Sequence, residues 1–234
     1  MNSCDELLRL AELVRELQQK TPLDGPAALD GLIRHVAESV PGARYAGITI
    51  AGRRRLETPA ATGRYPILLD EIQNREGEGP CVADAWDHNT IRIDDLAKAG
   101  RWPRYRRATL KHTPIRSVLS FKLFRDSQTA GALNLYAEQA RAFDDDSLRA
   151  GLAVAAHAAV AWDILQHAKQ FRDALASRDV IGQAKGILME RFEIDSVGAF
   201  DLLKRLSQES NTPVAELAEK LIDAEHPLRR RRGA

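Results

Sequence analysis

The sequence has little cysteine and no excess of either charge. Its 234 residues include two cysteines, Cys4 and Cys81, whose number and spacing provide neither a disulfide framework nor a zinc-binding motif. The formal net charge is +1, so the chain lacks the overall positive charge typical of proteins that bind nucleic acid over a broad surface. Any contact with nucleic acid must therefore come from a local patch.

Targeting and membrane segments are also lacking. The first six residues are polar and acidic and contain no apolar core, so no secretory signal is visible. The longest apolar run, residues 151–162, contains His157 and is shorter than the roughly 20 residues that span a bilayer. We therefore expect a cytoplasmic protein with no membrane partner.

The sequence offers little support for enzyme chemistry. Its six histidines are scattered without ligand spacing, so no metal site is expected. Cys81 follows a Gly-Pro turn with no histidine near it in the sequence. It has two interpretations, a candidate sensor that reacts as a thiolate and a small buried apolar residue at the start of a helix. We expect that the protein is not an enzyme, and no cofactor is evident.

Hydrophobic periodicity predicts an α+β order over residues 1–165. Helices are expected over residues 5–19, 27–40, 67–74, 82–87 and 101–112. Strands are expected over residues 45–51, 54–61, 90–93, 116–125 and 130–137. Two helices, then strands with an inserted helical section, then a hairpin give the α+β class.

A long helix is expected next, because acidic residues and Ser147 provide an N-terminal cap near Asp144. Its apolar residues follow a heptad spacing of alternating threes and fours. The members of this seam are Ile164, Ala168, Phe171 and Leu175. A lone apolar stripe extending past the first domain would be unstable. The seam therefore predicts pairing in a homodimer, with residues 166–176 as a helical coiled-coil linker.

The remaining sequence predicts a small three-helix bundle over residues 177–224. The first helix carries an apolar stripe at Ile181, Ala184 and Leu188. Gly186 within it costs roughly 0.5–1 kcal/mol relative to Ala, which favours close approach of a neighbouring helix or ligand. Asp195 or Ser196 and then Thr212-Pro213 signal the next two helix starts. Residues 225–234 contain four arginines and are expected to form a basic disordered tail.

This bundle resembles the ANTAR domain, a three-helix module that binds RNA and regulates transcription antitermination. The resemblance is carried by Ser177-Arg178, Ile181, residues 184–189 (Ala-Lys-Gly-Ile-Leu-Met), Ala199-Phe200, Leu203 and Ser207. It implies that the module grips paired small stem-loops in nascent transcripts. The residues expected to contact RNA are Arg178, Gln183, Lys185, Gly186, Lys204 and Arg205.

The first domain resembles a GAF domain of the kind joined to ANTAR modules. The resemblance is carried by residues 77–81 (Gly-Glu-Gly-Pro-Cys), 116–120 (Arg-Ser-Val-Leu-Ser), 131–136 (Gly-Ala-Leu-Asn-Leu-Tyr) and Phe143. It implies a six-stranded antiparallel sheet and a pocket that senses a small molecule, whose ligand the sequence does not identify.

The two resemblances together imply an RNA-binding antitermination regulator, controlled by a small-molecule or protein signal. The alternative is a small-molecule or redox sensor that signals through protein contacts and uses its C-terminal helices only for dimerisation. From Ser177 onward ten basic residues are balanced by ten acidic ones, and this neutrality favours the alternative.

Overall fold

The computed structural model describes residues 25–52, 55–82, 89–126 and 129–225. The chain divides into two compact units, Met1–Leu165 and Gln166–Ala234. The helix expected over residues 5–19, most of the one over 82–87 and the tail from residue 226 lie outside the described residues.

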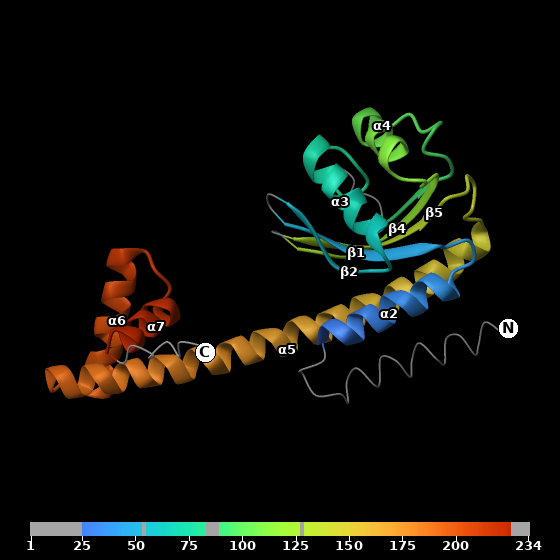
Figure 1. The fold of residues 1–234 in the computed structure, drawn as a ribbon. Coiled ribbons are helices and arrows are strands. Elements are labelled where there is room, and N and C mark those ends of the chain that lie inside the picture. The colour runs from blue at the N-terminus through green and yellow to red at the C-terminus, as the bar shows by residue number, and fades with distance from the viewer. Residues whose placement is uncertain (1–24, 53–54, 83–88, 127–128, 226–234) are drawn as a thin grey trace, which may run out of the picture. The chain divides into compact units, whose positions relative to one another are not determined.

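A mixed set of strands and helices forms the first unit, which confirms the expected α+β class (Figure 1). The helices are α2 (Gly25–Ser39), α3 (Arg64–Glu76), α4 (Pro103–His112) and the start of α5 (Asp145–Phe192). The strands are β1 (Tyr45–Ala51), β2 (Leu56–Ala61), β3 (Thr90–Ile93), β4 (Ser117–Arg125) and β5 (Ala130–Ala137). They pair antiparallel in the order β2-β1-β5-β4-β3. The described residues thus hold five strands where six were expected.

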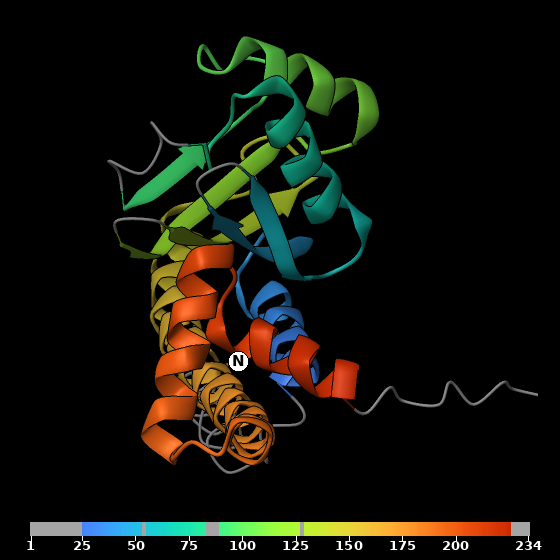
Figure 2. The same ribbon diagram turned by 90° about the vertical axis from the view of Figure 1, so that its left-hand side faces the viewer.

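The sheet separates two layers of helices, because successive side chains of a strand point to opposite faces. Helices α2 and α5 cover one face, and α3 and α4 cover the other (Figures 1 and 2). On the first face, Phe121 and Leu133 pack with Val154 and Ala158 of α5. Gly151 allows this approach, since a Cβ atom there would lie 2.3 Å from the Phe121 ring. On the second face, Leu69 and Tyr105 belong to a separate core.

The apolar run 151–162 lies within helix α5, which is 48 residues long. By length and composition the whole helix, and not the run alone, meets the criterion for a candidate membrane span. The core helix of a soluble protein meets the same criterion. Its residues Val154, Ala158 and Ala161 are buried in the core of the first unit.

The second unit consists of the rest of α5 with α6 (Ser196–Ser210) and α7 (Val214–Glu225). Its buried core is formed by Ala184, Leu188, Ala199, Leu203 and Ala218. Asp195 caps α6 as expected, accepting a hydrogen bond of 2.8 Å from the Gly198 N–H. The expected cap at Thr212 is wrong, because its hydroxyl donates backwards to the Ser210 carbonyl and α7 begins at Val214.

Candidate functional site

A network of buried polar side chains connects the sheet of the first unit to α3. The carboxylate of Asp70 accepts hydrogen bonds from the hydroxyls of Thr49 and Thr58, at 2.6 and 2.7 Å, and from Nε2 of Gln73 at 2.9 Å. Asn134 on β5 extends the network by donating to Oγ1 of Thr49 at 2.7 Å. Three strands and one helix are therefore held together by side-chain hydrogen bonds in the interior.

Asp70 is only 2% exposed, and burial raises its pKa from 3.8 to about 6, because the apolar surroundings disfavour its charged form. The hydrogen bonds from Thr49, Thr58 and Gln73 lower the pKa and offset part of this effect. Among the described residues, no cation pairs with this carboxylate. Near neutral pH the network therefore contains a buried group close to its titration point.

Cys81 lies in the same interior. It is fully buried, its backbone N–H donates to Oε1 of Gln73 at 2.8 Å, and its Sγ contacts the Asn134 amide at 3.3 and 3.6 Å. Burial raises the pKa of its thiol to about 12. A thiol that stays protonated is a poor nucleophile, so the structure favours the interpretation of Cys81 as a small buried residue over that of a thiolate sensor.

Two further hydroxyls in this layer, those of Tyr105 and Thr109 on α4, are buried close to each other, and neither makes a well-formed hydrogen bond to another described residue. A buried hydroxyl without a partner loses the hydrogen bonds that it makes in water. Both groups would therefore gain from a polar ligand atom that reached them.

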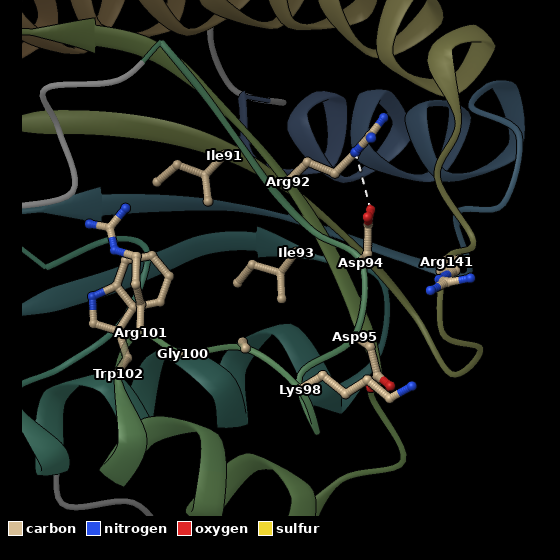
Figure 3. Close-up of a pocket in the computed structure, with 11 residues that line it drawn as sticks. Ile91, Arg92, Ile93, Asp94, Asp95, Lys98, Gly100, Arg101, Trp102 and Arg141 are labelled. Atoms are coloured by element: carbon tan, nitrogen blue, oxygen red, sulfur yellow. Dashed lines mark ion pairs between the residues drawn. The ribbon is translucent and has the colours of Figure 1, made fainter.

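A hollow of about 350 Å³ lies beside the edge strand β3. Ile91 and Ile93 project toward it from the strand, while Arg101 and Trp102 lie together at one end (Figure 3). The Arg101 guanidinium stands 4.3 Å from the centre of the Trp102 ring. Trp102 has a left-handed φ of 53°, which is unusual for a bulky residue and recurs at functional sites.

The charges around this hollow are unbalanced. Its lining contains the cations Arg92, Lys98, Arg101 and Arg141 and the anions Asp94 and Asp95. Arg92 pairs with Asp94 at 3.1 Å (Figure 3). A volume within the range of small-molecule sites, with apolar walls and excess positive charge, suits an anionic or aromatic ligand. No residue of this hollow was predicted as a site residue from the sequence.

A second hollow, of about 480 Å³, lies within the second unit where α5 faces α6. Arg178 and Lys185 line it, as their spacing of two helical turns predicts. Phe200 of α6 lies opposite them. The Nζ atoms of Lys185 and Lys204 stand 5.8 and 5.3 Å from the centre of the Phe200 ring. Two of the residues expected to contact RNA, Arg178 and Lys185, thus line one hollow with Phe200. Lys204 approaches the same ring but also pairs with Asp201 at 2.7 Å.

The other three lie apart from this hollow. Gln183 and Arg205 are exposed and do not line the hollow, and Gln183 lies about 100° around α5 from Gly182, which does. Gly186 is exposed, and a Cβ atom there would meet nothing within 4 Å. The expected close approach of a neighbouring helix at Gly186 is therefore wrong within the described chain.

The predicted dimer seam lies on the exposed side of α5. Ile164 and Ala168 are half-buried, whereas Phe171 and Leu175 are 66% and 45% exposed. In a single chain these two large apolar side chains remain largely in water.

Comparisons with known proteins agree with the two-unit division. A family model described as the GAF domain matches residues 25–163, and one described as the ANTAR domain matches residues 169–222. A comparison with curated proteins found no match.

Solved structures resemble the first unit in fold. The chromophore-binding domain of a bacteriophytochrome from R. palustris has 14% identity and a TM-score of 0.54, covering 72% of this chain. The present chain spans 64% of that domain. The GAF domain of a phosphoenolpyruvate-protein phosphotransferase from Coxiella burnetii has 16% identity and a TM-score of 0.52, covering 71% of this chain and 98% of that one. Such low identities establish the shared fold alone.

Proposed function

Because the chain belongs to the GAF domain family and carries an ANTAR domain after its GAF domain, we propose that it is an RNA-binding transcription antitermination regulator. The GAF domain receives a signal, and the ANTAR domain binds stem-loops in nascent transcripts. In this proposal the protein acts in the cytoplasm as a regulator, without catalytic activity and without a membrane partner.

The observation that carries the RNA-binding proposal is the cationic hollow of the ANTAR domain. The domain as a whole is close to neutral, so its affinity for RNA must come from a local concentration of positive charge. Arg178 and Lys185 supply that charge in the hollow that Phe200 lines, whereas the charge of Lys204 is balanced by Asp201. A guanidinium presents a planar pair of donors to a phosphate, and a lysine presents a mobile point charge.

The dimer seam supports binding as a pair. Two copies that packed Phe171 and Leu175 against each other would remove these exposed side chains from water. Two ANTAR domains held in one dimer would bind two stem-loops with an affinity multiplied by their effective concentration. The seam thus provides a reason why the RNA target would contain paired loops.

A small-molecule signal is supported by the hollow beside β3, which has the volume and the mixed lining of a ligand site. We propose that ligand binding in this domain changes the RNA affinity of the ANTAR domain.

The alternative is a sensor that signals through protein contacts and binds no RNA. The neutral charge of the second unit favours it, as do the exposed apolar residues of the seam. Sequencing the RNA that co-purifies with the full chain from its own cells distinguishes the two. Enrichment of transcripts with paired stem-loops supports antitermination, and recovery of no specific RNA supports the alternative.

Single substitutions then test the cationic hollow. Arg178→Ala and Lys185→Ala should each weaken binding to an enriched stem-loop by about 1–3 kcal/mol and reduce the salt slope by about one. Lys220→Ala is the matched control, since it removes the same charge from α7, outside the hollow and outside the residues expected to contact RNA. Equal losses from all three variants would contradict a specific role for the hollow.

A further inference from the structure

Phe200 is partly exposed and does not belong to the buried core of the ANTAR domain. Its ring is 37% exposed, and it is absent from the buried cluster that Ala199 and Leu203 form on the same helix. It instead lines the hollow between α5 and α6, with the ammonium groups of Lys185 and Lys204 near its ring. An aromatic surface surrounded by cations is therefore presented to solvent.

The floor of this hollow is open beside the ring. Gly182 lines it, and a Cβ atom there would meet nothing within 4 Å. The glycine leaves space for a flat group to lie over α5. The hollow's volume of about 480 Å³ is within the range of small-molecule sites, so a single nucleobase fits.

We propose that Phe200 is the platform on which one unpaired base of the RNA stacks, while Arg178 and Lys185 bind the phosphates beside that base. This inference rests on the proposed RNA-binding function and identifies the part of the RNA that the hollow recognises. Every base has a flat π-face, and proteins that bind unpaired bases combine aromatic platforms with cationic side chains. A fully paired stem keeps its bases stacked on one another, so the site would select loops.

A second copy of this chain is the competing occupant. Two copies joined through this face would bring Arg178 and Lys185 of one chain near those of the other, and like charges at a contact are unfavourable. RNA supplies the opposite charge. The charges of the hollow therefore favour RNA over a second copy.

The test measures binding of the full chain to synthetic RNA stem-loops with randomised loops, using the parent, Phe200→Leu and Phe200→Trp. Phe200→Leu keeps an apolar side chain but removes the π-face, so affinity should fall about 5- to 150-fold. Phe200→Trp should retain the parent affinity. No charge changes in either variant, so the salt dependence of binding should stay as in the parent.

A matched control and a direct reporter complete the design. Leu206 on the same helix is 39% exposed, and Leu206→Ala should bind like the parent. A 2-aminopurine placed in the loop of a binding RNA should lose fluorescence when it stacks on the Phe200 ring of the parent. The same loss is expected with the indole ring of the Phe200→Trp variant. This readout decides the question even if Phe200→Leu were to fold poorly.

The outcomes separate the two proposals. If the parent retains none of the stem-loops, both the RNA-binding function and the stacking site are overturned. If the parent binds and Phe200→Leu binds equally well, only the stacking site is overturned. Loss of affinity in Phe200→Leu with retention in Phe200→Trp and Leu206→Ala supports it.

Discussion

Asp70 should make the stability of the GAF domain depend on pH between about 4 and 7. Burial raises its folded-state pKa to about 6, whereas an aspartate in an unfolded chain titrates near about 3.9. The folded state thus holds the Asp70 proton more tightly than the unfolded state does. The stabilisation from this group is fully present below about pH 3.9 and is lost as the pH rises through about 6. A pKa difference of about 2 corresponds to ~3 kcal/mol.

Comparison with Asp70→Asn isolates this contribution. The pKa values of Glu78, Asp95 and Asp144 are lowered, so these groups contribute stability above their unfolded pKa values and lose it as the pH falls. Their effect is common to the parent and the variant and cancels in the difference. The advantage of the parent over Asp70→Asn should therefore shrink by ~2 kcal/mol between pH 4 and pH 7.

Urea denaturation followed by tryptophan fluorescence measures this difference in the full chain. All three tryptophans, Trp86, Trp102 and Trp162, lie in the first unit, so the signal reports that unit. Glu71→Gln on the same helix is the control, because an exposed side chain should change the free energy of unfolding by less than about 0.5 kcal/mol. A parent-to-variant difference that stays constant from pH 4 to pH 7 would refute the buried, titrating Asp70.

Three further outcomes are expected. Phe171→Glu should shift the protein toward monomer in light scattering without unfolding it, because the side chain is 66% exposed in the single chain; an unchanged mass would contradict the seam. Gly182→Ala should stabilise α5 by roughly 0.5–1 kcal/mol in thermal melts and yet weaken stem-loop binding, since its Cβ enters the open hollow. If Gly182→Ala bound the stem-loop as tightly as the parent or more tightly, the hollow would not be the RNA-binding site. Cys81 should resist alkylation in the native protein at pH 8 and react after denaturation, because its thiol is buried and the pKa of that thiol is raised to about 12. Peptide mass spectrometry distinguishes labelled Cys81 from labelled Cys4. Rapid labelling of Cys81 in the native protein would contradict its burial.

The sequence alone determined the local structure of this protein. Strands β1, β3 and β5 begin and end where the sequence pattern predicts, because side chains alternate between the two faces of a strand. The apolar stripe of α5 was likewise visible, since helical geometry repeats every 3.6 residues. Helix α3 begins three residues before its expected start, at Arg64, and it also runs past Asn74 because Gly77 ends it in a left-handed conformation.

Tertiary structure alone decided which distant side chains meet. The hydrogen bonds of Asp70 join β1, β2 and α3, and no spacing along the chain predicts that convergence. The direction of a helical residue also depends on how its helix packs. Lys185 therefore lies beside Phe200, while Gln183, two residues earlier on α5, does not line the hollow. Residue types and local periodicity are written in the sequence, whereas a site formed between elements exists only after those elements have packed.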